Sequence, residues 1–305
     1  MTRVIGIDAG GTKIQGLVLD LEKNILFQSL SGHGNPTVSF DEALTNLSSV
    51  VQQCLDHSSS EDVSHIIIGM AGAESGNLAH RIKKELERMT SLPIILLNDA
   101  TLAYFSLIGN QCGVITIAGT GSICYGRNGK REGTTGGWGH ILGDEGSAYS
   151  LAIEASKQIA WEFDSHKPIS PLSRNLLNEI GANDAKDFKG FIYSSTKGKI
   201  AQLAKVIHEQ AEAGDEAAIH LFKTAGEQLA RQTIALIEKL QIETKPVVAL
   251  KGSVLEHNPV VQSVFKEIIS DCFKDTAYIV DSTSPATGAV GVVEAIKEGR
   301  MLYDE

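Results

Sequence analysis

The chain has few cysteines and no pattern among them. Its 305 residues include only four, which are scattered and show no CxxC spacing: Cys54, Cys112, Cys124 and Cys272. Zinc sites and redox centres usually place cysteines at short fixed spacings, and disulfide frameworks are typical of small secreted domains. We therefore expect reduced thiols in a cytoplasmic protein, with neither a zinc site nor a disulfide framework.

Long apolar runs and basic clusters are also missing. No apolar stretch approaches the ~20 residues that cross a bilayer. Strand-forming residues begin within the first few positions, so we expect no signal peptide. Lys and Arg number 27 against 37 Asp and Glu, which gives a net charge of −10. Nucleic-acid-binding domains usually carry a basic surface, so we expect neither nucleic acid nor a membrane as a partner.

Glycine is abundant, and the most informative glycines lie in the segment VIGIDAGGTK near the N-terminus. Strand-forming residues lead to Asp8, and Gly10 and Gly11 then turn the chain before Thr12 and Lys13. Glycines there can adopt positive φ and leave backbone N–H groups open to a phosphate. A carboxylate at the strand end can hold Mg²⁺ directly or through water. The spacing fits neither the Walker A pattern GxxxxGK(S/T) nor GxGxxG.

The order of predicted elements occurs twice along the chain. Three strands, a helix, a strand, a helix, a strand and a helix follow one another, and VITIAGTGS (114–122) then repeats the pattern of VIGIDAGGT. Short apolar strands that alternate with helices indicate an α/β fold with parallel pairing. We predict two duplicated βββαβαβα units: residues 1–112, completed by a C-terminal helix at 286–305, and residues 113–285, with a helical insertion at about 165–245.

A turn-rich loop, SGHGNPT, precedes the first predicted helix. Ser39 is the expected N-cap of that helix, and Glu42 is placed to complete a capping box. Asn35, within the loop, carries an amide that could meet an acetamido group of a ligand. Its position before Pro36 equally suits a turn residue, and chemistry alone favours the turn.

A second glycine-threonine turn, formed by Gly119, Thr120, Gly121 and Ser122, ends the first strand of the second unit. Two such turns from two domains could hold one triphosphate with Mg²⁺, so we expect the ligand between the domains. Gly252-Ser253 follows a predicted strand and precedes a helix. A glycine there would let a nucleoside lie against the backbone, and an ordinary strand-to-helix turn is an equal alternative.

Two further stretches carry candidate chemistry. Asp99 closes a buried strand, where a carboxylate in an α/β domain faces the ligand crevice and could accept a proton from an attacking hydroxyl; a capping role is equally good. In GGWGHILGDEGS (136–147), Trp138 lies between glycines and would serve as a flat platform for a sugar ring. Asp144 could accept hydrogen bonds from sugar hydroxyls. His140 is expected to be a structural hydrogen-bonding residue.

On these motifs the chain resembles the N-acetylglucosamine kinases of the acetate and sugar kinase/heat-shock/actin superfamily. They belong to the branch shared with the BadF/BadG/BcrA/BcrD-type ATPase activators of 2-hydroxyacyl-CoA dehydratases. The resemblance runs over the whole chain and is carried by IDAGGTK, NDA, AGTGS, GGWGHILGDEGSAY and KGSV, the fourth being the most specific. It implies two ribonuclease-H-like domains with an actin-like ATPase fold. It also implies transfer of the ATP γ-phosphoryl group to the 6-hydroxyl of N-acetyl-D-glucosamine or a closely related amino sugar.

The resemblance also implies roles for individual residues. Asp99 would be the base and would contact the sugar, and Asp8 would hold Mg²⁺. The nucleotide would contact both turns and the segment after the later strand: Asp8, Gly10, Gly11, Thr12, Lys13, Gly119, Thr120, Gly121, Gly252 and Ser253. The sugar would contact Asn35, Asp99, Ser122, Gly137, Trp138, Gly139 and Asp144.

One departure leaves the choice of sugar open. Ile123 follows Ser122 at the position where the mammalian-type enzymes carry an amide residue that touches the sugar. An enzyme that phosphorylates both N-acetylmuramic acid and N-acetylglucosamine is therefore an alternative. Glucosamine and glucose are further alternative substrates. The CxCGxxGCxE-type zinc motif of the other large bacterial sugar-kinase group is absent, so we expect no zinc.

Two alternatives lie outside the sugar kinases. An ATPase activator of a dehydratase needs cysteines that hold an iron–sulfur cluster, and the cysteine spacing gives no such site. A sugar-sensing regulator needs an output module, and we expect none, because two domains account for the length of the sequence. The sequence leaves the oligomeric state open, with a homodimer as one alternative.

Overall fold

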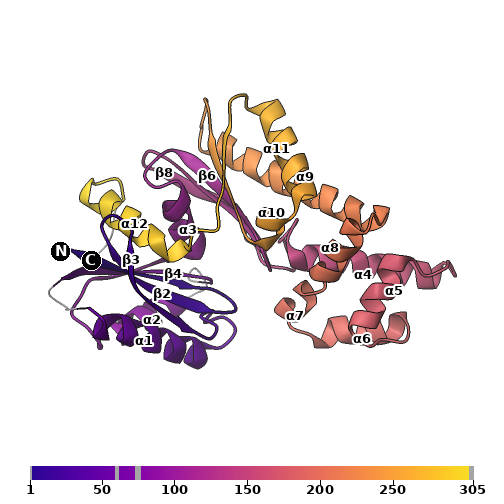
Figure 1. The fold of residues 1–305 in the computed structure, drawn as a ribbon, viewed down its shortest axis with the longest axis horizontal. Coiled ribbons are helices and arrows are strands. Elements are labelled where there is room, and N and C mark those ends of the chain that lie inside the picture. The colour runs from indigo at the N-terminus through magenta and orange to yellow at the C-terminus, as the bar shows by residue number, and fades with distance from the viewer. Residues whose placement is uncertain (1, 59–61, 73–76, 302–305) are drawn as a thin grey trace. The chain divides into compact units, whose positions relative to one another are not determined.

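The computed structural model describes residues 2–58, 62–72 and 77–301. Its contacts divide the chain into two compact units (Figure 1). Unit 1 comprises Met1–Ile115, Tyr125–Glu132 and Asp281–Glu305, and unit 2 comprises Thr116–Cys124 and Gly133–Val280. Residues 302–305, at the end of the predicted C-terminal helix, lie outside the described part of the chain.

The first sheet lies in unit 1 and is built from the N-terminal third of the chain. Its strands follow the order β3-β2-β1-β4-β5. Strand β1 pairs antiparallel with β2 and parallel with β4, which pairs parallel with β5. The elements in chain order are β1 (Arg3–Ala9), β2 (Ile14–Asp20), β3 (Ile25–Ser31), α1 (Phe40–Asp56), β4 (Val63–Met70), α2 (Leu78–Leu86), β5 (Ile94–Asn98) and α3 (Asp99–Leu107).

The second sheet repeats the strand order of the first. Its order is β10-β9-β6-β7-β8, so each strand takes the place of its counterpart in β3-β2-β1-β4-β5, read from the opposite edge. The duplicated α/β fold predicted from the sequence is therefore confirmed. The strands are β6 (Gly113–Ala118), β7 (Ser122–Asn128), β8 (Arg131–Gly136), β9 (Val247–Lys251) and β10 (Ala277–Val280).

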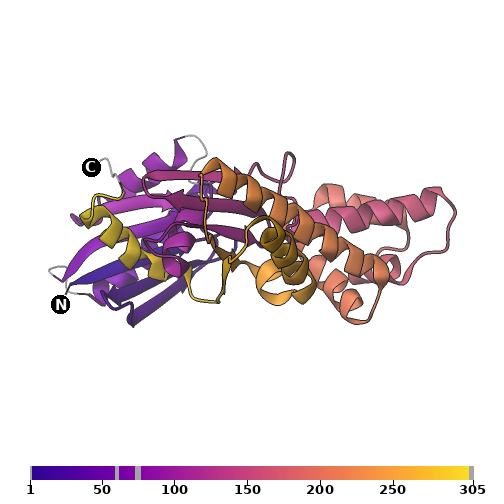
Figure 2. The same ribbon diagram turned by 90° about the horizontal axis from the view of Figure 1, so that it is seen from above.

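Helices fill the long connection between β8 and β9. They are α4 (Ala148–Asp164), α5 (Pro171–Glu179), α6 (Ala185–Ser194), α7 (Lys197–Ala201), α8 (Ala204–Glu212) and α9 (Glu216–Lys239). That part of this connection is an insertion into the repeated unit stays a prediction. After β9 come α10 (Ser253–His257) and α11 (Pro259–Cys272), and α11 packs along α9 in both views (Figures 1 and 2). The short helix η1 (Pro285–Thr287) and α12 (Gly288–Lys297) end the described chain.

Both faces of the first sheet are covered. Ile5 and Ile7 of β1 belong to a buried cluster with residues of α1 and α2. Gly6, between them, faces the other way, and a Cβ built on it would lie 2.0 Å from the carbonyl oxygen of Ala286. Only glycine permits this approach, so the end of the chain packs directly onto the backbone of its first strand.

The start of α1 differs from the prediction. Ser39 is the N-cap residue, but its side chain makes no capping hydrogen bond. The Oε2 atom of Glu42 lies 3.0 Å from Nε2 of His33, in the preceding loop. The predicted capping box is therefore wrong, because Glu42 pairs with the loop instead of with the N-cap backbone.

All four cysteines are free. Cys54 and Cys124 are buried, and burial raises the pKa of the Cys54 thiol to about 12 and also raises the pKa of Cys124. Cys112 and Cys272 are exposed. None of the helices that the structure describes has both the length and the apolar character to cross a membrane.

Candidate functional site

The first glycine turn is a tight connection between β1 and β2. Ala9 pairs with Ile14, and the N–H of Gly10 donates to the carbonyl of Lys13 at 3.0 Å. Neither Gly10 nor Gly11 adopts the positive φ that the sequence allowed for. A Cβ built on Gly11 would meet no described atom within 4 Å. No contact within the described residues requires glycine at position 11, and the turn is uncovered there.

Asp8 and Asp99 lie at the same edge of the unit 1 sheet. Asp8 pairs across β1 and β4 with Gly69, and Gly69 pairs with Leu97, two residues before Asp99. The strands β1, β4 and β5 run parallel, so their carboxyl ends share one edge. With strands about 4.8 Å apart, the two positions are separated by roughly 10 Å. That edge is where α/β domains bind ligands.

The capping alternative for Asp99 can be tested from the geometry of α3. The N-cap of α3 is Asn98, whose side chain accepts from the N–H of Ala100 at 2.9 Å. Asp99 is the first helical residue, and its Oδ1 accepts from the same N–H at 3.0 Å. Because Asn98 already supplies the cap, the carboxylate of Asp99 is not needed for that role.

The Asp8 position suits Mg²⁺ of the kind that bridges to phosphates. Within the described residues no group of three or more His, Cys, Asp and Glu side chains is arranged to hold a metal ion. Mg²⁺ in nucleotide sites usually binds through one or two carboxylates, with water and phosphate completing its shell. A half-buried carboxylate beside an open turn fits that mode.

Asn35 lies in the loop that packs against the first turn. The N–H of Gly34 donates to the carbonyl of Gly10 at 2.9 Å. The Oδ1 of Asn35 accepts from the N–H and the hydroxyl of Thr37, at 2.9 and 2.7 Å. Asn35 therefore has the turn role that its chemistry favoured, and contact with an acetamido group remains a prediction for its amide N–H.

The second glycine turn lies in unit 2 against the start of α4. The N–H of Gly119 donates to the carbonyl of Gly121, and the carbonyl of Gly119 accepts from Ala148, both at 2.9 Å. A Cβ on Gly121 would lie 2.8 Å from Oδ1 of Asp144 and 2.8 Å from Nζ of Lys197. Gly121 therefore makes room for a carboxylate and an ammonium.

Ser122 and Asp144 form a buried polar pair in unit 2. Ser122 donates its N–H to Oδ1 of Asp144 at 3.2 Å and its hydroxyl to the carbonyl of Glu145 at 2.7 Å. The two residues are only 4% and 3% exposed. Asp144 adopts φ +64°, a left-handed conformation that is uncommon outside glycine and often found at functional sites.

Trp138 lies outside the core, between two glycines of positive φ. It is 74% exposed, and Gly137 and Gly139 have φ of +72° and +80°. The side chain of Ile123 occupies the space where a Cβ of Gly137 would lie, at 2.8 Å. An exposed indole is available as a platform for a ring. His140 stacks edge-on against Tyr149, with ring centroids 5.1 Å apart.

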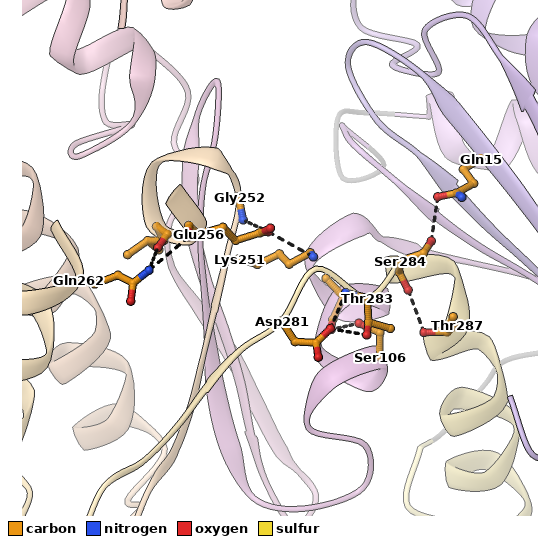
Figure 3. A network of polar contacts seen from close by, with 12 residues as sticks. Gln15, Ser106, Lys251, Gly252, Glu256, Gln262, Asp281, Thr283, Ser284 and Thr287 are labelled. Atoms are coloured by element: carbon orange, nitrogen blue, oxygen red, sulfur yellow. Dashed lines mark hydrogen bonds and ion pairs between the residues drawn. The ribbon is translucent and has the colours of Figure 1, made fainter. Parts of the chain in front are cut away.

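Gly252 sits between β9 and α10, and Ser253 is the first residue of α10. Gly252 has φ +89°, and a Cβ on it would lie 2.5 Å from the carbonyl oxygen of Ala118, beside the second turn. Its N–H donates to Oε1 of Glu256 at 2.8 Å, and Nζ of Lys251 lies 3.2 Å from the same oxygen (Figure 3). The segment therefore packs against the start of the second glycine turn, and its contact with a nucleoside stays a prediction.

Two side chains near Asp144 were not found by sequence reasoning. Nζ of Lys197 lies 2.6 Å from Oδ2 of Asp144. Gln232, on α9, donates to Oε2 of Glu145 at 3.1 Å. Neither stands in a motif or at a periodic spacing from the 136–147 segment, so only the tertiary structure reveals them.

A sequence model of the BadF/BadG/BcrA/BcrD ATPase family matches residues 5–295. The chain belongs to this family. It is 32% identical over 298 residues to the N-acetylmuramic acid/N-acetylglucosamine kinase of Clostridium acetobutylicum, across 95% of this chain and 97% of that protein. It is 26% identical over 310 residues to the N-acetyl-D-glucosamine kinase of Dictyostelium discoideum, across 93% and 95%.

The fold is shared with solved structures. A candidate N-acetylglucosamine kinase from Chromobacterium violaceum aligns with a TM-score of 0.77 and 21% identity, over 95% of this chain and 98% of that one. Together with membership of the BadF/BadG/BcrA/BcrD ATPase family, these matches confirm the predicted family, the two-domain α/β fold and the ATP-dependent sugar-kinase class. The roles of individual site residues stay predictions.

Proposed function

We propose that the chain transfers the γ-phosphoryl group of ATP to the 6-hydroxyl of N-acetyl-D-glucosamine or a closely related amino sugar. The observation that carries this proposal is the placement of Asp99, at the carboxyl edge of a parallel sheet beside a helix that Asn98 already caps. We further propose that the reaction takes place in the cytoplasm, where ATP is abundant.

Asp99 is the general base in this mechanism. Its carboxylate accepts the proton of the sugar hydroxyl as that oxygen attacks the γ-phosphorus, and the bond to the β-phosphate breaks to leave ADP. The turns that contain Thr12 and Thr120 bind the phosphates through N–H groups and hydroxyls. Mg²⁺ held through Asp8, when bound, offsets phosphate charge.

A small set of side chains is proposed to bind the sugar. Trp138 would stack on the ring, Asp144 and Ser122 would bind hydroxyls, and Asn35 would meet the acetamido group. N-acetylmuramic acid is the second candidate substrate, supported by the similarity to the dual-specificity Clostridium enzyme and by Ile123, which offers no polar contact to the sugar.

A panel of sugars in a coupled assay of ADP release tests the proposal. We expect N-acetylglucosamine to accelerate ADP release to a kcat of about 1–100 s⁻¹, the usual range for kinases, with glucose slower. The 6-deoxy analogue is the matched control, since it lacks the accepting hydroxyl and should give no phosphorylated product. ADP release that no amino sugar accelerates would reject the proposal.

Tryptophan fluorescence tests the sugar platform separately from turnover. The chain has two tryptophans, Trp138 and Trp161, which are 74% and 62% exposed. A sugar stacked on Trp138 excludes water from the indole, so we expect emission to shift to shorter wavelength. The shift should persist in Trp161→Phe and disappear in Trp138→Phe. A shift that persists in Trp138→Phe and disappears in Trp161→Phe would show that Trp138 does not bind the sugar.

A further inference from the structure

The carboxylate of Asp144 has one oxygen that the described protein does not hydrogen-bond. Oδ1 accepts from Ser122, whereas Oδ2 is buried and accepts no hydrogen bond within the part of the chain that the structure describes. Nζ of Lys197 lies 2.6 Å from Oδ2, as an ion pair without hydrogen-bond alignment. Oδ2 is therefore paired with the ammonium, and it is the ammonium, with three N–H donors, that has capacity left for a ligand.

The ammonium of Lys197 reaches the same place from a different part of the chain. Lys197 is the first residue of α7, and its Nζ would lie 2.8 Å from a Cβ atom built on Gly121. The side chain is 31% exposed, so solvent and ligands can reach it. A sugar bound beside Asp144 would therefore lie close to this ammonium.

Lys197 also lines a cavity of about 980 Å³ that lies wholly within unit 2. Its walls come from α4, α6 and α7, and His140 and Ile141 extend it to the 136–147 segment. Helices α6 and α7 both contact α4 (Figure 1). The cavity is therefore continuous with the segment that carries Trp138 and Asp144.

The lining of this cavity is positively charged in an acidic protein. It includes four lysines against one acid, Asp164, although the whole chain carries a net charge of −10. Lys157 and Lys197 are partly neutralised, because their Nζ atoms each lie 2.6 Å from a carboxylate oxygen, of Glu154 and Asp144 respectively. Lys186 and Lys189 extend the positive charge along α6, and Nζ of Lys189 lies 5.9 Å from the ring centre of Tyr193. This charge favours an anionic ligand group.

We propose that Lys197 selects for an amino sugar that carries a carboxylate, of the N-acetylmuramate class, and binds that carboxylate at the mouth of the lysine-lined cavity. The inference rests on the proposed kinase function and adds a specificity residue to it. A neutral sugar offers the ammonium no charged partner in addition to Asp144, whereas the carboxylate of a lactyl ether is such a partner. A charge-assisted hydrogen bond of this kind corresponds to about 10- to 100-fold in affinity.

The experiment compares Lys197→Met with Lys199→Met, a control two residues along the same helix whose ammonium lies over the Phe191 ring. For each protein we would measure kcat/KM with N-acetylmuramate and with N-acetylglucosamine, and the KM for ATP. Lys197→Met should lower the ratio of the two kcat/KM values by at least ~10-fold. Lys199→Met should leave the ratio at its wild-type value. Lys197→Arg, which retains a positive charge, should give a ratio close to the wild-type value.

Other results would overturn the inference in distinguishable ways. If the wild-type protein phosphorylates N-acetylglucosamine but not N-acetylmuramate, the proposed carboxylate site is wrong and the proposed kinase function is retained. If the protein phosphorylates neither sugar, the proposed kinase function itself is wrong. An equal loss with both sugars, together with a raised KM for ATP, would make Lys197 a phosphate ligand.

A wild-type measurement keeps the test independent of how the variants fold. Added KCl screens an ammonium–carboxylate contact, so the KM for N-acetylmuramate should rise with salt more than the KM for N-acetylglucosamine. Equal salt dependence for the two sugars would contradict a carboxylate bound by Lys197.

Discussion

Asp99→Asn should lower kcat by about 10²- to 10⁴-fold, the usual effect of losing a general base. The amide keeps the size of the side chain and can still accept from the N–H of Ala100, as Oδ1 of Asp99 does. The helix start therefore remains, whereas the capacity to take up the hydroxyl proton is lost. ATP affinity, measured by equilibrium binding, should change little, because the base is assigned to the sugar side of the reaction.

The matched control is Asp41→Asn. Asp41 is an exposed acid in the first turn of α1, so this change also removes a negative charge from a helix start. It lies outside the proposed site and should leave kcat unaltered. Near-normal turnover of a folded Asp99→Asn protein would withdraw the assignment of the base.

Gly252→Ala should lower the free energy of unfolding of unit 2 by about 2–4 kcal/mol. Alanine at φ +89° costs about 1 kcal/mol or more, and forcing a methyl to within 2.5 Å of the Ala118 carbonyl adds about 1–3 kcal/mol of overpacking. The strain falls beside the second glycine turn, so we also expect a higher KM for ATP. Urea unfolding can be followed by Trp138 and Trp161, which lie in the same unit.

Gly214→Ala separates the two contributions. Gly214 has φ +88°, but a Cβ built on it meets no described atom within 4 Å. Its replacement should cost only the conformational part, about 1 kcal/mol. Equal destabilisation by the two changes would show that contact with Ala118 contributes nothing.

The fold was accessible from the sequence because its signals are local. Apolar runs that lead to Asp8 and to Asp99, and two similar glycine turns, can be recognised from neighbouring residues. The repeated strand order follows from that pattern. Contacts between distant segments were not accessible, as Lys197 beside Asp144 and Glu42 beside His33 show. Side-chain pairing of this kind depends on the packing of whole elements, which periodicity does not encode.

The glycine turns illustrate a subtler limit. The sequence allowed Gly10 and Gly11 positive φ, yet neither adopts it. In the 136–147 segment and after β9, the residues with positive φ are Gly136, Gly137, Gly139, Asp144, Gly146 and Gly252. The sequence shows where the glycines are, but the structural reason for glycine differs from one position to the next. Gly121 makes room for side chains and Gly252 for a backbone carbonyl, whereas a Cβ on Gly11 would meet only open space.

The contact between Gly6 and Ala286 has a consequence for biosynthesis. The ribosome delivers β1 long before α12, so one face of that strand stays uncovered while the intervening chain is synthesised. Such late closure between sequence-distant segments is slow and leaves apolar surface exposed in the meantime. Maturation of unit 1 should therefore depend on chaperones more than that of the helices of unit 2, whose partners are synthesised close together.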